Sequence, residues 1–320
     1  MKKLRNILVP TDFSPSARQA LAYGLGLARR SAATLHLMHV MNPVEGDSFS
    51  PLKYTPEAHA LHKSHDASIY ELLETALSEF DTEGLEVELV KRRGMRMSEP
   101  ILAYAKKEEV DLIVMGTHGR RGIKHLLMGS VASDVVRHAP CDVMAVHEKP
   151  THEENNIERI LACVDFSPHS DAVLKQAHAL AAGYHARLDL LHVVEPLAFP
   201  VSLTGICTIY DIVPDLQGKV EERLDKLVSG VEKPEVDIET HITDGHAAHT
   251  IIEFAEELDA NLIVMATHGL SGLDRFLLGS VTSRVIRLAP CPVFVVKSEH
   301  MDREAPAEEQ AVDFSGIGLA

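Results

Sequence analysis

Short apolar runs alternate along the chain with longer segments whose apolar residues recur at helical spacing. In the first half these runs predict strands near 5–9, 34–40, 86–91, 111–115 and 142–146. Unbroken apolar runs such as LIVM in the fourth of them suit a parallel sheet that is covered on both faces. Five such strands joined by right-handed helical crossovers make a doubly wound α/β domain, flanked by helices.

Helices are expected between these strands, at 15–31, 57–80, 97–108 and 130–138. The starts of three of them carry serines whose hydroxyls could cap free backbone N–H groups: Ser14, Ser98 and Ser130. The segments 41–56 and 195–215 have no clear period, and we interpret both as long surface loops.

The whole pattern occurs twice. KLRNILVPTDFSPSARQAL at 3–21 matches NIERILACVDFSPHSDAVL at 156–174, and residues 110–146 match residues 260–296. A period of about 150 residues is too long for a solenoid unit, so duplication of a whole domain explains it. A chain of 320 residues has room for two such domains, each with its own core. The expected parts are a first domain at 1–148, a linker at 149–156, a second domain at 157–298 and an acidic, mobile tail at 299–320.

Composition narrows the class of protein. The chain is 45% apolar and 24% charged, as expected of a globular protein. Its 47 acidic against 31 basic residues argue against general affinity for nucleic acid or anionic membranes. No apolar run reaches the roughly 18 residues of a membrane span, and the four cysteines form no CxxC pair. We therefore expect a cytoplasmic protein with reduced thiols.

The clearest chemical signal is a glycine loop that follows the fourth strand of each repeat. It reads GTHG at 116–119 and, nine residues on, GS at 129–130; the second copy reads ATHG at 266–269 and GS at 279–280. A glycine-rich loop that leaves a strand and ends at a helix start can direct backbone N–H groups at phosphate. In a doubly wound sheet the strand ends meet at one edge, so Asp12 and Val40 should lie beside this loop.

These residues resemble the universal stress protein family in its tandem form, over about 3–147 and 156–297. The resemblance is carried by PTDFS and CVDFS, the HV after the second strand, MGTHG and MATHG, the Gly-Ser helix start and APC-x-V before the last strand. It implies strand order 3-2-1-4-5, a pocket for ATP with Mg²⁺, and pairing of the two domains through their last strands. It also implies a role in survival under stress, permits a homodimer, and leaves the protein partner unidentified.

The first half carries the complete G-x-x-G, nine residues, G-[ST] pattern of the family's ATP-binding subgroup. We expect the glycine backbone, the Ser130 hydroxyl and the first helical amides to face the phosphates, and Asp12 to accept hydrogen bonds from ribose or adenine. By resemblance, the main chain of Val40 reads adenine. The full expected set is Pro10, Thr11, Asp12, Val40, Gly116, Thr117, His118, Gly119, Arg120, Arg121, Gly122, Gly129, Ser130, Val131 and Ala132.

The second half departs from this pattern. Ala266 replaces the first glycine, Cys163 replaces Pro10, and Leu270 and Ser271 replace the two arginines. A methyl group blocks close approach if that backbone needs a positive φ, and the lost charges weaken phosphate attraction. We therefore expect one strong site and one weaker or altered site. The second candidate set is Cys163, Val164, Asp165, Val193, Ala266, Thr267, His268, Gly269, Gly279, Ser280, Val281 and Thr282.

Other chemistry is less well supported. The motifs GxxxxGK[ST], GxSxG and HExxH are absent, so we predict no catalytic residue and at most slow ATP hydrolysis. His59, His62 and His65 share a predicted helix face, which we interpret as solvated, and we predict no metal site. A bound anion would favour protonation of His118 and its counterpart in the second loop, which would couple nucleotide affinity to pH.

Three functions compete on these grounds. The favoured one is a stress-response protein whose ATP occupancy sets its conformation or its choice of partner. A second is a nucleotide-independent interaction scaffold. The third is an ATPase or nucleotidyl-transfer enzyme, which rests on analogy between folds alone.

Overall fold

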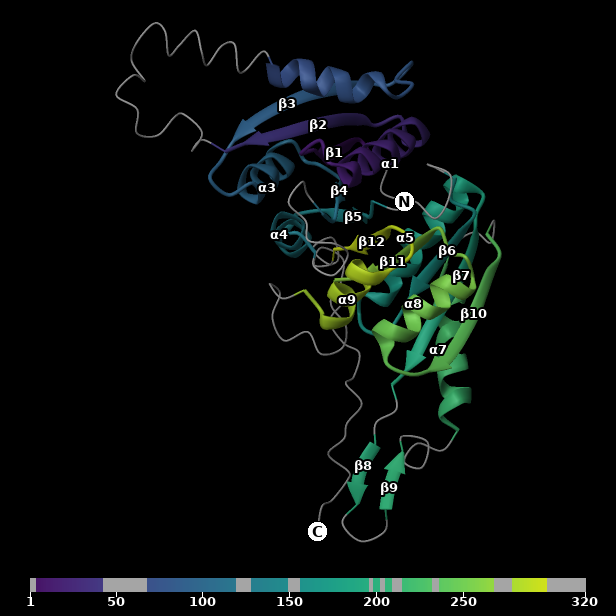
Figure 1. Cartoon of the computed structure of the whole chain (residues 1–320). Coiled ribbons are helices and arrows are strands. Elements are labelled where there is room, and N and C mark those ends of the chain that lie inside the picture. The colour runs from purple at the N-terminus through teal and green to yellow at the C-terminus, as the bar shows by residue number, and fades with distance from the viewer. Residues whose placement is uncertain are drawn as a thin grey trace, which may run out of the picture.

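The computed structural model of the chain describes residues 4–42, 68–118, 128–148, 156–195, 198–201, 205–208, 215–231, 236–267 and 278–297. The expected tail and residues 149–155 of the expected linker lie outside the described residues, so the domain boundaries stay predictions. Figure 1 shows a single long sheet that runs through both halves of the chain, with helices packed along it.

Each half contributes five parallel strands to this sheet. In the first half they are β1 (Asn6–Pro10), β2 (Thr34–Met41), β3 (Val87–Arg93), β4 (Leu112–Gly116) and β5 (Asp142–Val146). In the second half they are β6 (Arg159–Cys163), β7 (Arg187–Val194), β10 (Ile238–Asp244), β11 (Leu262–Ala266) and β12 (Val293–Val296). The strand orders are β3-β2-β1-β4-β5 and β10-β7-β6-β11-β12, so the predicted order 3-2-1-4-5 is confirmed in both halves.

The two halves join through their last strands. β5 and β12 pair in antiparallel register, with Val143 opposite Val295 and Ala145 opposite Val293, and a ten-stranded sheet results (Figure 1). The predicted pairing of the halves within one chain is confirmed by this register. All four side chains are buried, because β5 and β12 become central strands of the joined sheet.

Two apolar layers cover the two faces of the sheet, because successive strand residues point to opposite faces. Val114 and Val264 lie in one layer, and Ile113 and Ile263 lie in the other. Each layer thus contains residues of both halves. The expectation of two separate cores is wrong, since the joined sheet lets each layer run through the whole protein.

The helices follow the expected alternation. In the first half they are α1 (Pro15–Ser31), a helix over residues 68–78, α3 (Ser98–Lys107) and α4 (Ser130–His138). In the second half they are α5 (Ser170–Tyr184), α7 (Leu216–Ser229), α8 (Ala247–Glu257) and α9 (Ser280–Leu288). Of the helix expected at 57–80, residues 57–67 lie outside the described residues, as do His59, His62 and His65.

One of the three expected caps is confirmed. Ser14 accepts a hydrogen bond from the Ala17 N–H and caps α1. Ser98 is instead the first residue of α3, and its hydroxyl donates to the Asp134 carboxylate. Ser130 is likewise the first helical residue of α4, because Gly129 occupies the cap position in extended backbone. The cap predictions for Ser98 and Ser130 are therefore wrong by one position.

The prediction of a surface loop at 195–215 is also wrong in part. Strands β8 (Ala198–Val201) and β9 (Gly205–Thr208) pair there as an antiparallel hairpin, which lies apart from the main sheet (Figure 1). The two segments read AFPV and GICT with three residues between them, which is enough to close a hairpin. Pro200 in such a short run obscures the strand signal in the sequence.

Candidate functional site

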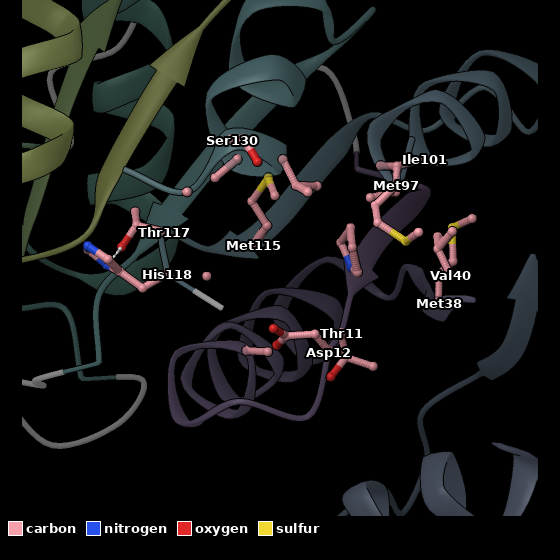
Figure 2. A pocket seen from close by; sticks show the side chains of 16 residues that line it. Thr11, Asp12, Met38, Val40, Met97, Ile101, Met115, Thr117, His118 and Ser130 are labelled. Atoms are coloured by element: carbon pink, nitrogen blue, oxygen red, sulfur yellow. Dashed lines mark hydrogen bonds between the residues drawn. The ribbon is translucent and has the colours of Figure 1, made fainter. Parts of the chain in front are cut away.

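A cavity of about 400 Å³ opens at the carboxyl ends of β1, β2 and β4, beside the first turn of α4 (Figure 2). Every predicted first-half site residue that the structure describes lines this cavity. They are Pro10, Thr11, Asp12, Val40, Gly116, Thr117, His118, Gly129, Ser130, Val131 and Ala132. The remaining four, Gly119, Arg120, Arg121 and Gly122, lie outside the described residues. The strand-end argument therefore located the cavity correctly.

One end of the cavity is apolar, and the sequence interpretation missed most of it. Figure 2 shows Met38, Val40, Met97 and Ile101 gathered at one end, with Thr117, His118 and Ser130 toward the other. Met38 is two residues before Val40, so strand alternation could have assigned it to the same face. The other residues missed are Ala17 and Met115.

The turn after β1 holds Asp12 at the cavity wall. Asp12 Oδ1 accepts a hydrogen bond from the Ser14 N–H at 3.0 Å, and the Thr11 N–H donates to the Met38 carbonyl at 2.8 Å. Phe13, between Asp12 and Ser14, has φ of 61°, a left-handed conformation that is energetically unfavourable for a non-glycine residue. The bond from the Ser14 N–H fixes the direction of the Asp12 carboxylate.

Gly116 is needed for packing between elements. A methyl group at this position would lie 2.6 Å from Ser16 Oγ and 2.9 Å from the Ala17 nitrogen, in the first turn of α1. Its φ is outside the left-handed region, so the condition of a positive φ is not met, and the glycine is required by space alone. The missing side chain lets α1 approach the end of β4, where Ser14 and Ser16 hydroxyls donate to the His118 carbonyl.

The first turn of α4 lies at the cavity and has no side-chain cap among the described residues. The Gly129 N–H donates to the Thr117 carbonyl at 2.8 Å, and the Ser133 N–H makes the first bond back to the Gly129 carbonyl. The amides of Ser130, Val131 and Ala132 precede the helical ladder, and all three residues line the cavity. Such amides at a helix start favour an anion.

The second half repeats the framework. Asp165 Oδ1 accepts from the Ser167 N–H at 3.0 Å, Phe166 has φ of 59°, and the Gly279 N–H donates to the Thr267 carbonyl at 2.9 Å. The candidates Cys163, Val164, Val193, Ala266, Ser280, Val281 and Thr282 occupy the matching strand ends and helix start. His268 and Gly269 lie outside the described residues. Because the left-handed turn occurs in both halves, it belongs to the fold and does not distinguish a binding half.

Two side chains of the second half differ from those at the matching first-half positions. The Thr282 hydroxyl, buried where the first half has Ala132, donates to the Ala266 carbonyl at 2.8 Å. Burial raises the pKa of the Cys163 thiol far above its ordinary value, as does the neighbouring Cys291, whose own pKa burial raises to about 12. Cys163 is therefore a protonated, poorly nucleophilic thiol.

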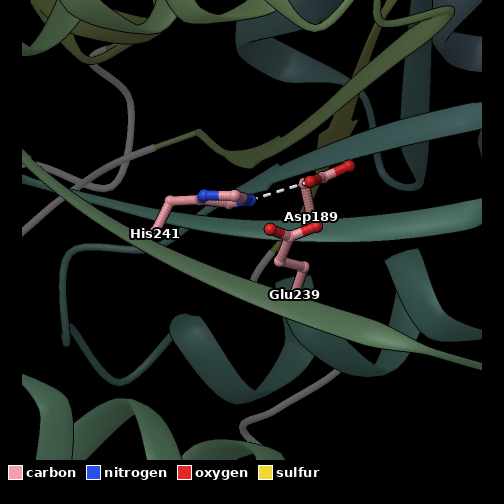
Figure 3. A group of neighbouring side chains, drawn as sticks. All are labelled: Asp189, Glu239 and His241. Carbon is pink, nitrogen blue, oxygen red and sulfur yellow. Dashed lines mark hydrogen bonds and ion pairs between the residues drawn. The ribbon is translucent and has the colours of Figure 1, made fainter.

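A polar cluster that sequence reasoning missed lies at the start of β7 and β10. Asp189, Glu239 and His241 share one face there, and His241 Nε2 contacts Asp189 Oδ1 at 2.8 Å (Figure 3). Arg159 holds the same carboxylate with two bonds, of 2.7 Å from Nε and 2.9 Å from Nη2. Burial alone would raise the pKa of Asp189, but the hydrogen bonds from Arg159 and His241 hold it below its ordinary value. With both oxygens bound to Arg159, this cluster is a buried ion pair, and a metal ion would have to displace the guanidinium.

The described part of the chain has no helix that combines the length and hydrophobicity of a membrane span.

Comparison with known proteins identifies relatives of this chain. Universal stress protein A homolog 1 of Coxiella burnetii is 35% identical over 142 residues, which is 43% of this chain and 95% of that protein. A universal stress protein of Mycolicibacterium smegmatis is 26% identical over 298 residues, covering 91% of this chain and 96% of that one.

Among solved structures, a universal stress protein from Archaeoglobus fulgidus matches with a TM-score of 0.63 at 22% identity. It covers 93% of this chain and 99% of its own, so the two-half fold recurs as a whole. The family model for the universal stress protein family matches residues 3–147 and, separately, 156–297. Two successive matches over most of the sequence show that this chain belongs to the universal stress protein family, in its tandem form.

Proposed function

We propose that the cavity of the first half binds ATP, and that its occupancy sets the conformation or the protein partner of a stress-response protein. The observation that carries this proposal is the first turn of α4, which has no side-chain cap among the described residues and lines the same cavity as Asp12 and the apolar end. A nucleotide needs these three surfaces together, namely a flat apolar contact, an acceptor for ribose and donors for phosphate. The cytoplasmic location and the homodimer stay predictions.

The lining residues divide naturally over the parts of ATP. Met38, Met97 and Ile101 would contact the purine ring, with Val40 beside them. Asp12, fixed by the Ser14 N–H, would accept from the ribose. The amides of Ser130 to Ala132 would face the phosphates, with the hydroxyl of Ser130 at the same place.

Mg²⁺ fits this arrangement as a companion of the phosphates. Asp12 is the one carboxylate in the described lining, and one of its oxygens already accepts from a backbone amide. Mg²⁺ bound with a triphosphate takes most of its ligands from phosphate oxygens and water, so few protein ligands are needed. It would neutralise phosphate charge, which an acidic protein with a net charge of −16 requires.

The second half is proposed as a weaker or altered site. The Thr282 hydroxyl bonded to the Ala266 carbonyl, and the cysteine in place of Pro10, support this asymmetry. Occupancy of one half alone would make the two halves of a symmetric sheet unequal. That inequality is the physical basis we propose for partner selection.

The experiment is to denature the purified full chain and separate the released small molecules by anion exchange, before and after soaking with Mg-ATP. We expect ATP near one equivalent per chain. Absence of nucleotide even after soaking would contradict the proposal in favour of the scaffold, and rapid conversion to ADP or AMP would contradict it in favour of the enzyme. Gly119→Val should abolish binding whereas the matched Gly269→Val should cost less, and equal losses would contradict the asymmetry.

A further inference from the structure

In both α4 and α9, a carbonyl near the end of the helix is bonded by a cationic or imidazole side chain of the other half. Lys297 follows β12, and its Nζ donates to the carbonyl of Arg137 near the end of α4, at 2.8 Å. His147 follows β5, and its Nε2 lies 2.6 Å from the carbonyl of Ile286 near the end of α9. The antiparallel pairing of β5 with β12 generates this exchange, because it brings the end of each strand to the helix of the other half.

The contact between Lys297 and α4 is made by a buried residue. Lys297 is only 8% exposed, and its own N–H donates to Asp142 Oδ1 at 2.8 Å, which ties both ends of the residue to the first half. A buried ammonium on a helix carbonyl is a charge-assisted bond, and a cation at a helix end complements the helix dipole. Burial lowers the pKa of His147, so near neutral pH its bond to α9 is made by a neutral ring. The stronger of the two contacts therefore supports the helix of the first pocket.

A second connection joins the first pocket to the same junction. The Thr117 N–H and hydroxyl both donate to the carbonyl of Val146, at 2.9 Å and 3.3 Å, and Val146 directly precedes His147. Thr117 Oγ1 also lies 2.9 Å from His118 Nδ1, and both residues line the cavity (Figure 2). The pocket wall is thus hydrogen-bonded to the last residue of β5, the strand that pairs with β12 at the junction between the halves.

We propose that Lys297, a residue of the second half, is a positioning residue of the first pocket, and that His147 has the reciprocal role for α9. This inference rests on the proposed ATP site. A helix of nine residues moves as a unit, so a bond near its end fixes where its first-turn amides lie. A bound anion at the start of α4 and the Lys297 ammonium near its end both stabilise the same orientation of the helix dipole. Nucleotide binding and the Lys297 contact therefore strengthen each other.

The test compares Mg-ATP affinity of the full chain with that of Lys297→Met and Lys297→Arg by calorimetry. We expect Lys297→Met to weaken binding roughly two- to tenfold and Lys297→Arg to restore most of it, since the guanidinium can still donate to the carbonyl. Lys226→Met removes an equal charge from an exposed position on α7 and should leave the affinity unchanged. Wild-type affinity in a folded Lys297→Met chain would overturn the inference while leaving the ATP site intact.

A measurement on the unaltered chain covers the case in which Lys297→Met fails to fold. Mg-ATP should slow amide hydrogen exchange in α4 and also in β12 and Lys297, although β12 belongs to the other half. Slowing confined to the first half would overturn the inference. If the wild-type chain binds no Mg-ATP at all, the proposed function itself fails, which is a distinguishable result.

Discussion

The turn after the first strand is built alike in the two halves, whereas the helix that follows it begins differently. α1 begins at Pro15, capped by Ser14, but in the second half the matching Pro168 and His169 form a turn and α5 begins at Ser170. The residue opposite this turn is Gly116 in one half and Ala266 in the other. A methyl group at 116 would meet the first turn of α1. The second half carries that methyl group, in Ala266, and its helix begins two residues later.

This comparison bears on the two unequal pockets that we propose for one fold. The strands, their order and the left-handed turn are common to both halves, because the apolar sheet requires them. Besides the start of the first helix, the two halves differ in side chains at the strand ends and helix starts, such as Ala132 against Thr282 and Pro10 against Cys163. Binding capacity can therefore change between duplicated halves without any change of fold.

The largest expected effect is a loss of stability on substitution of Asp189 in β7, which aligns with His36 in β2. Asp189 is 1% exposed and is bonded to Arg159 and His241, so Asp189→Ala leaves a guanidinium without its partner. We expect the free energy of unfolding to fall by about 3–5 kcal/mol. Denaturant unfolding measures it, and His36→Ala, which breaks a bond to the Tyr104 hydroxyl without stranding an Arg partner, is the matched variant. A loss below about 1 kcal/mol for Asp189→Ala would refute a stabilising buried ion pair.

The next largest effects are expected from substituting Gly116 by alanine and, separately, Ala266 by glycine. Gly116→Ala should destabilise the protein by about 1–3 kcal/mol by overpacking and weaken Mg-ATP binding at least roughly tenfold, because the start of α1 must move. Ala266→Gly should change stability by less than about 1 kcal/mol. Thermal unfolding and calorimetry check both. Unchanged ATP affinity in Gly116→Ala would show that the start of α1 does not shape the pocket.

A smaller effect is expected from exchanging Ala132 and Thr282. Ala132→Thr places a hydroxyl where the second half bonds the 266 carbonyl, so it should weaken ATP binding in the first half roughly threefold. Thr282→Ala removes that hydroxyl and should leave first-half affinity unchanged. Competition titration with a fluorescent ATP analogue would measure both variants. Equal effects of the two substitutions would count against separate pockets.

The smallest effect is a dependence of stability on pH through His192. Burial lowers its pKa from the ordinary 6.5, and Arg223 adds to this, although the Val164 carbonyl and Asp165 oppose it. The unfolded chain therefore binds a proton first as the pH falls below about 6.5, so acidification reduces the free energy of unfolding through this residue. His192→Asn should remove part of the loss between pH 7 and pH 5. An unaltered slope in that variant would contradict the assignment.

Much of this architecture follows from the sequence, for identifiable reasons. Runs such as LIVM before Gly116 and Ala266 fix central strands, and the strand-end rule placed Asp12 and Val40 in one cavity. Met97 was missed because it stands at a helix start, where no strand alternation applies. The Asp189 ion pair was missed because its members come from three strands, and only the folded register brings them together.

The central claim is that one nucleotide binds per chain, in the first half. Calorimetric titration of the nucleotide-free full chain with Mg-ATP tests it most directly. The account predicts a single strong site per chain, lost in Gly119→Val and retained in Gly269→Val. Two equal sites, or no binding at all, would contradict it.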